Sequence, residues 1–291
     1  MKRILTLFLA CILLLSPCTV SALTPGERLA VVGADLTDAQ LDDVYEFFGV
    51  RRGSVRELKL CADEEKALLS GLVDADVIGS RSVSCVCIEL AEKGSGLELH
   101  THNITWCTEE MFLTALSTAG IGDARVTVAA PFASAGTAAL AGIYKAWEAL
   151  SGTALDETAK DAGAQELAAA ASLSEALGSE NALRIIAELK ALVGSEPAID
   201  GDALNEKLGA LADELELRLP EDGADRLRGL FETFKKLDPQ ALREKAEAAA
   251  ETLRRVQAVK EKADGFFGAL RRFFLPVIDF FGRLFAKTKS S

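Results

Sequence analysis

The 291-residue sequence is poor in the features that mark specialised protein classes. Its 7 proline and 23 glycine residues are too few for a collagen-like or low-complexity chain. Six cysteines in a chain of this length do not make a small disulfide scaffold. Basic residues are outnumbered, 32 against 44 acidic, and the net charge of −12 excludes a surface built to follow nucleic-acid phosphates. What remains is ordinary globular composition, 49% hydrophobic and 26% charged.

Long hydrophobic runs are also scarce, and the N-terminal one is short. Lys2 and Arg3 precede the apolar run Ile4–Leu15, which falls short of the roughly 20 residues that a membrane-spanning helix needs. The small residues Val20-Ser21-Ala22 then form a cleavage pattern. We therefore predict a secretory signal peptide over residues 1–22 and an extracytoplasmic protein, with an uncleaved anchor as the alternative.

The cysteines left after such a cleavage are Cys61, Cys85, Cys87 and Cys107. In an oxidising compartment four cysteines allow three pairings, and the sequence does not choose among them. A bond between Cys85 and Cys87 is the least favoured, because residues i and i+2 of a strand lie about 6.5 to 7 Å apart.

Strand and helix signals alternate over residues 23–152. The pattern predicts strands at residues 28–34, 54–60, 80–90, 97–105 and 125–130, and helices that begin near Thr37, Asp63, Thr108 and Gly136. The segment Lys93-Gly94-Ser95-Gly96 joins two of these strands and is typical of a hairpin. We therefore predict an α+β fold, with an α/β-like N-terminal domain that contains a mixed sheet.

Strand signals stop after Gly152, and the chain becomes rich in Ala, Leu, Glu and Lys. Three segments carry apolar residues at helical spacing. They are Ala182, Ile186, Leu189 and Val193; Leu204, Leu208, Leu211 and Leu215; and Leu227, Leu230, Phe234 and Leu237. Short links between such segments predict an all-α helical bundle over residues 153–264, followed by a separate tail, residues 265–291.

Several segments between Val32 and about Gly194 resemble a known family in their order and spacing. They are Gly33-Ala34-Asp35-Leu36-Thr37, Ile78-Gly79-Ser80-Arg81, Asn103-Ile104-Thr105, Thr118-Ala119-Gly120-Ile121, Ala130-Pro131, and the run that begins Gly136-Thr137-Ala138. The family is DUF 1002, bacterial secreted proteins of unknown function. The resemblance implies secretion and no established reaction. Where the family usually shows Ser before Gly-Thr, this chain has Ala135, so no nucleophilic serine is carried over.

Two loops that follow strands form the first candidate site. Asp35 follows one strand, and Gly136-Thr137 open a helix after another. If the two strands are parallel neighbours, both loops lie at the carboxyl edge of the sheet, where backbone N–H groups could bind an anion and Asp35 a cation or hydroxyl. The candidate ligand-binding residues are Asp35, Thr37, Asn103, Thr105, Gly136 and Thr137. The alternative is that they are ordinary helix caps and turn residues.

A second candidate is a zinc site on the predicted hairpin. A two-residue turn would place Cys85, Cys87, His100 and His102 on one face of the hairpin beside Glu89, and zinc accepts all of these ligand types. A three-residue loop would scatter them, and their spacing is not typical of a structural zinc site. Disulfides or a mixed polar face are the alternatives, and we predict no metal or other cofactor.

The tail combines aromatic residues with positive charge. It holds seven of the 14 phenylalanines, which recur every seven residues. Five basic side chains against the single Asp279 give it a net charge of +4. This predicts a basic amphipathic helix, kinked at Pro276, that lies on a surface. The predicted contact residues are Phe266, Phe267, Phe273, Phe274, Phe280, Phe281, Phe285, Arg271, Arg272 and Arg283.

Three surfaces could receive these phenylalanines: the protein itself or a second copy in a homo-oligomer, a membrane surface, or the groove of a partner protein. The leading hypothesis is a secreted or cell-envelope binding protein without enzymatic activity, held at the outer membrane surface or cell wall by its tail. The alternative is an extracytoplasmic hydrolase with a cleft near Asp35 and Gly136-Thr137. No nucleic-acid partner is expected, and neither ligand nor substrate follows from the sequence.

Overall fold

The computed structural model describes residues 24–247. The predicted signal peptide, the end of the predicted helical region and the phenylalanine-rich tail lie outside these residues. Within 24–247, no helix combines the length and the apolar character that crossing a bilayer requires.

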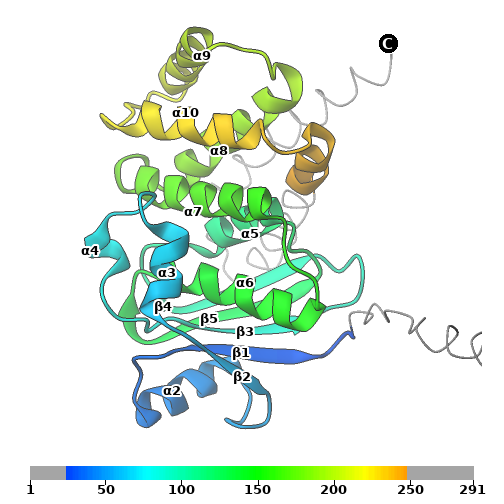
Figure 1. The fold of residues 1–291 in the computed structure, drawn as a ribbon. Helices are drawn as coiled ribbons and strands as arrows, with labels where there is room; N and C mark the ends of the chain where they lie inside the picture. The colour runs from blue at the N-terminus through cyan, green and yellow to red at the C-terminus, as the bar shows by residue number, and fades with distance from the viewer. Residues whose placement is uncertain (1–23, 248–291) are drawn as a thin grey trace, which may run out of the picture.

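Five strands form one mixed sheet, which confirms the predicted α+β fold. They are β1 Arg28–Gly33, β2 Arg56–Leu60, β3 Cys85–Leu90, β4 Leu97–Ile104 and β5 Ala124–Ser134. The spatial order is β2-β1-β3-β5-β4 (Figure 1). The pairs β1–β2 and β4–β5 are parallel, whereas β3 is antiparallel to both of its neighbours. Four strands therefore end at the edge where β3 begins, and this edge is called the carboxyl edge below.

The predicted hairpin between residues 80–90 and 97–105 is wrong, because β5 lies between β3 and β4. Val128 of β5 is opposite Val86 on one side and Thr101 on the other. The position of β5 between β3 and β4 has a physical reason. The middle of β5 is buried on both faces and suits the interior of the sheet, whereas β4 alternates buried leucines with exposed Glu98 and His100 and suits an edge.

The helices predicted near Thr37, Asp63, Thr108 and Gly136 begin within one residue of those positions, whereas the helices at residues 75–78 and 157–177 were not individually predicted. The bounds of the described helices are α2 Asp38–Phe48, α3 Ala62–Leu69, α4 Ala75–Ile78, α5 Glu109–Ala119, α6 Thr137–Ser151, α7 Glu157–Leu177, α8 Ser179–Ser195, α9 Gly201–Glu214 and α10 Gly223–Phe234. Thr37 forms a capping box at the start of α2, and Thr108 caps α5. Gly49 and Gly120 end these helices in the left-handed conformation.

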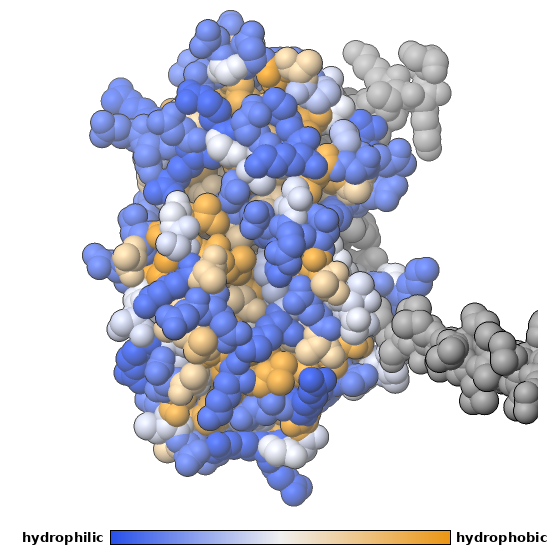
Figure 2. Space-filling view, viewed as in Figure 1, coloured by the Kyte–Doolittle hydropathy of each residue, from blue (hydrophilic) through white to orange (hydrophobic). Residues whose placement is uncertain are grey.

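The elements stack in layers (Figure 1). Helix α2 covers one face of the sheet, α5 and α6 cover the other, and α7 lies on them, followed by α8 with α10 and then by α9. One hydrophobic core runs from sheet residues such as Val86 through Phe112 of α5 to Phe234 of α10. A smaller core joins α2 to the opposite face of the sheet. The outer surface in this view is mostly hydrophilic, with scattered hydrophobic residues (Figure 2).

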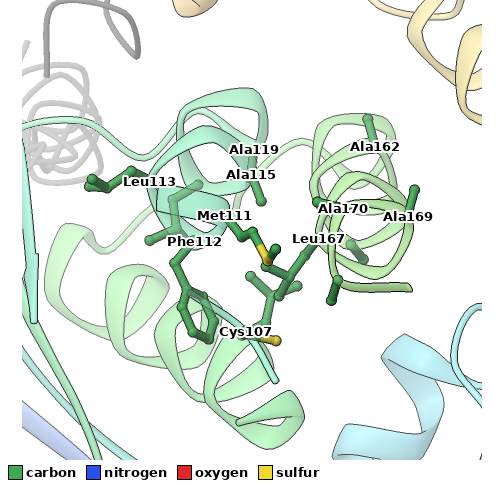
Figure 3. Close-up of a cluster of buried hydrophobic side chains, with 14 of the residues drawn as sticks. Cys107, Met111, Phe112, Leu113, Ala115, Ala119, Ala162, Leu167, Ala169 and Ala170 are labelled. Carbon is green, nitrogen blue, oxygen red and sulfur yellow. The ribbon is translucent and has the colours of Figure 1, made fainter. Parts of the chain in front are cut away.

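Helices α5 and α7 approach closely because their facing side chains are small. Ala115 and Ala119 of α5 lie opposite the alanine-rich face of α7, with Met111 and Leu167 filling the wider part (Figure 3). A Cβ atom on Gly163 of α7 would lie 2.7 Å from the backbone oxygen of Ala115. This seam joins the layer that covers the sheet to the outer helices.

Candidate functional site

The six predicted ligand-binding residues lie at the carboxyl edge or just beside it, in loops, at the end of β4 or at the start of α6. Strands β1 and β5 point the same way, but β3 separates them, so they are not the parallel neighbours that the prediction assumed. The loops after β1 and β5 nevertheless share the carboxyl edge.

Asp35 joins two of these loops to each other. Its Oδ2 accepts a hydrogen bond of 2.8 Å from the amide of Ser82, and its backbone oxygen accepts one of 2.8 Å from the guanidinium of Arg81. The loops touch so closely that a Cβ atom on Gly33 would lie 2.2 Å from the backbone oxygen of Ser82. The carboxylate of Asp35 is therefore engaged in holding the loop 80–84 against the end of β1.

Thr37, Asn103 and Thr105 also make hydrogen bonds that support the local fold. Thr37 caps α2. Asn103 adopts a positive φ of 59° at the irregularity in β4, and its side chain donates to the backbone oxygen of Ala130 at 2.8 Å. The hydroxyl of Thr105 donates to the backbone oxygen of Ser134 at 3.0 Å.

Gly136 and Thr137 start α6 at the carboxyl edge. Gly136 has a φ of 92°, and a Cβ atom there would lie 2.5 Å from Cγ2 of Ile104. Thr137 is buried, and its hydroxyl donates a hydrogen bond of 2.5 Å to Oε1 of Glu65 on α3. The turn at Gly136 thus points a hydroxyl at a buried carboxyl group.

Glu65 is the most unusual side chain at this edge, because it is only 1% exposed. Burial raises the pKa of its carboxyl group, while the hydrogen bond from Thr137 and the charge of Lys66 oppose the rise. Within residues 24–247 the structure records no ion pair and no other hydrogen bond for this carboxyl group. A buried carboxyl without a cationic partner is costly to ionise, and such groups concentrate at functional sites.

A pocket of about 270 Å³ opens beside Glu65, and we call it the edge pocket. It lies between α3, the end of α4 with the loop that follows it, the end of β5 and the start of α6. Its polar and aromatic lining consists of Glu65, Ser80, Arg81, Ser84, Phe132, Ser134 and Thr137. The hydroxyls of Ser84 and Ser134 lie 3.2 Å apart, and Phe132 is 42% exposed. Thr137 is the predicted candidate that lines this pocket.

A larger pocket, of about 350 Å³, lies between α3, α6 and α7. Its two lysines already have acidic partners: Lys145 lies 2.6 Å from Glu64, and Lys160 lies 3.0 Å from Glu157. Because these charges already have partners, the edge pocket is the stronger candidate for recognising a ligand.

The structure separates the four zinc candidates. Strand β5 lies between β3 and β4, so Thr127 stands between Cys87 and His100 in the register. Cys85 and Cys87 are buried against α2, and His102 stacks on Phe47 at 4.6 Å between ring centroids. No group of three or more His, Cys, Asp or Glu side chains within the described ranges could hold a metal ion. The structure therefore does not bring these four residues together as the zinc site considered from the sequence.

All four described cysteines have free thiols, in contrast to the expected disulfides. Cys61 is exposed, Cys85 and Cys87 lie in the core beneath α2, and Cys107 lies in the main core. Burial raises the pKa of Cys85 and of Cys107 to about 12 and that of Cys87 to about 11, so these thiols stay protonated and unreactive at neutral pH.

Sequence reasoning did not select Glu65 or the other side chains that line the pocket beside Thr137. One signal was present for Glu65, since it stands three and four positions before Leu68 and Leu69, on the face of α3 that packs inward. Arg81 was part of a segment that carried the family resemblance, but nothing in the sequence indicated that Phe132 and Ser134 would face it.

Comparison with known proteins finds matches over a region of the chain that includes the carboxyl edge. The model of a family described as "Protein of unknown function (DUF1002)" matches residues 32–263. "Uncharacterized protein YpuA" of Bacillus subtilis (strain 168) is 36% identical over 214 residues, which cover 73% of each chain. No solved structure matches the chain.

Proposed function

The chain belongs to the DUF1002 family of proteins of unknown function, and from that premise we propose that it is an extracytoplasmic binding protein. It holds a small polar ligand in the edge pocket and lies at the membrane surface through residues 265–291. The observation that carries the proposal is the buried Glu65, hydrogen-bonded to Thr137 at the wall of the pocket.

The composition of the edge pocket supports binding. Ligands of α/β sheets commonly bind beyond the carboxyl ends of strands, where loops from several strands meet. The edge pocket adds a guanidinium, a carboxyl group and four hydroxyls to an apolar wall, which is the usual make-up of a small-ligand site. Hydrolysis by paired carboxyls would need a second acid beside Glu65. The carboxylate of Asp35 is already engaged, because it accepts a hydrogen bond from the amide of Ser82.

The attachment to a membrane rests on the tail sequence and on the surface of the described residues. The tail carries seven phenylalanines and a net charge of +4, a combination that favours the surface of an anionic bilayer. Within residues 24–247 the exposed large hydrophobic side chains are Phe47 and Phe132, which lie on different elements. Two separate rings do not form a surface that would receive seven phenylalanines.

Flotation with lipid vesicles tests the membrane attachment. The full chain is expected to float with vesicles that contain phosphatidylglycerol, and a chain that ends at Asp264 is expected to stay in the soluble fraction. Vesicles of phosphatidylcholine alone serve as the control and should bind the full chain more weakly. If the full chain stays soluble with both kinds of vesicle, the proposed attachment is wrong.

A thermal-shift screen tests ligand binding in the edge pocket. The full chain is melted with a mixed library of amines, amino acids, carboxylates and sugars, beside the variant Glu65→Gln. At least one compound class is expected to raise the melting temperature of the unaltered chain by mass action and to lose most of that effect in the variant. The proposal fails if no compound stabilises the chain.

A further inference from the structure

The hydroxyl groups of the edge pocket indicate what kind of ligand it suits. Ser80, Ser84, Ser134 and Thr137 each supply one donor and two acceptor positions. One hydroxyl proton of the pair Ser84 and Ser134 is used in the hydrogen bond between these two side chains, and the hydroxyl of Thr137 donates to Glu65. The remaining donor and acceptor positions can meet a ligand that is itself both donor and acceptor, as a hydroxyl group is.

The charges that line the edge pocket also favour a neutral ligand. Its ionisable lining residues are one acid, Glu65, and one base, Arg81. Arg81 uses one N–H group on the backbone of Asp35, and a guanidinium has five. A strong anion or cation would leave one of these two groups facing a like charge, whereas a neutral polar ligand bonds to both.

Phe132 provides an apolar face beside these polar groups. It follows Pro131 near the end of β5, is 42% exposed and lines the edge pocket. The other exposed phenylalanine, Phe47, is stacked on His102, whereas the structure records no ring contact for Phe132 within residues 24–247. A solvent-exposed aromatic ring beside a polar pocket is suited to packing against the C–H face of a ligand.

We infer that the edge pocket binds a single sugar ring, with Phe132 against its C–H face and with Glu65, Arg81 and the serine and threonine hydroxyls toward its hydroxyl groups. The volume of about 270 Å³ suits one such ring rather than a chain of several. The inference rests on the proposed binding function and specifies its ligand class.

Saturation-transfer NMR on the full chain tests the inference, with glucose, galactose, N-acetylglucosamine and myo-inositol as separate probes. At least one probe is expected to show transfer, and its titration gives a dissociation constant. Phe132→Ala is expected to weaken binding about tenfold, since aromatic contacts dominate such sites. Phe47→Ala removes a similarly exposed phenylalanine from α2 and should leave the constant within about twofold.

The outcomes separate the ligand class from the binding function. The inference is supported if a sugar shows transfer, if Phe132→Ala weakens its binding and if Phe47→Ala leaves its binding unchanged. Transfer that Phe132→Ala does not affect places the sugar elsewhere and overturns it. If no sugar binds while an amine or carboxylate of the thermal-shift library does so in a Glu65-dependent way, the sugar class alone falls. If nothing binds, the proposed binding function falls with it.

Discussion

Two glutamates buried in different regions of the molecule have very different surroundings. Glu166, in the outer helical layers, is fully buried and accepts hydrogen bonds of 2.6 Å from the ammonium of Lys190 and from the hydroxyl of Thr118. Glu65, at the carboxyl edge, is only 1% exposed, but within residues 24–247 it accepts a single hydrogen bond, from Thr137. Where the helices meet, the buried carboxyl is paired with a cation of the chain, whereas at the sheet edge the buried carboxyl lies at the wall of a pocket.

This difference distinguishes a structural carboxyl from a candidate binding group. The Glu166 pair joins α7 to α8, and Thr118 joins it to α5, so its partners all come from the packed interior. Glu65, by contrast, lies at the wall of the edge pocket. Losing a partner should therefore cost stability at Glu166, whereas removing the charge should not at Glu65.

The largest expected effect follows from removing the cation beside Glu166. Lys190→Met leaves a buried carboxylate without its partner and should lower the free energy of unfolding by about 3 to 5 kcal/mol. Urea denaturation followed by circular dichroism measures the change.

Two further variants show whether the loss comes from the orphaned charge. Lys207→Met removes a lysine that is 43% exposed and pairs with Glu196 at 3.0 Å, and should cost at most about 1 kcal/mol. Adding Glu166→Gln to Lys190→Met removes both charges and should recover a large part of the loss. A double variant no more stable than Lys190→Met would show that lost packing, not charge, explains the effect.

An intermediate effect is expected at the seam between α5 and α7, the helices that carry Thr118 and Glu166. Gly163→Ala places a methyl group 2.7 Å from the backbone oxygen of Ala115 and should cost about 1 to 3 kcal/mol in urea denaturation. The control is Gly209→Ala in α9, where an added Cβ meets no atom within 4 Å; it should be neutral or stabilise by up to about 1 kcal/mol. Equal effects of the two variants would mean that the seam is not closely packed.

The smallest expected effect concerns the pH dependence of stability at Glu65. Because the folded-state pKa of this carboxyl is raised above its ordinary value of 4.5, the folded state holds the proton more tightly than the unfolded state. The free energy of unfolding therefore gains from Glu65 at low pH and loses that contribution as the pH rises above 4.5.

The variant Glu65→Gln has no such titration. Its free energy of unfolding, relative to that of the unaltered chain, should rise as the pH increases from 4.5 to neutrality. Urea denaturation at a series of pH values measures the difference. Parallel curves for the two chains would show that Glu65 is not perturbed, and the contrast with Glu166 would then disappear.

Local features of the fold followed from the sequence, because they depend on residues close together in the chain. The capping box of Thr37 with Gln40 and the left-handed Gly120 are examples. The strand order did not follow, because whether β3 meets β4 or β5 is decided by burial of β5 on both faces. Helix α7 was also not delimited, since its alanines form a packing face only against a helix as close as α5.

The candidate site was predictable only in its position. The loops at Asp35 and Gly136 indicated the edge at which the edge pocket lies, although most of the selected side chains cap helices or tie loops. Glu65 was not selected, although its spacing to Leu68 and Leu69 places it on the inward face of α3, because its full burial depends on how α3 packs against α6. Phe132 was missed for a similar reason, as its place beside Arg81 arises from the fold.

The strand order has a consequence for how the chain reaches this structure. Among the five described strands, no neighbouring pair is connected by a tight turn, because each pairing closes a loop that contains a helix or another strand. Central β3 pairs with β1, more than 50 residues earlier, and with β5, more than 30 residues later. Such a sheet has high contact order and no local nucleus, so its assembly should be slow and should wait until Ser134 is available. Any truncation that removes β5 is expected to leave β3 and β4 without a common partner and the sheet unable to form.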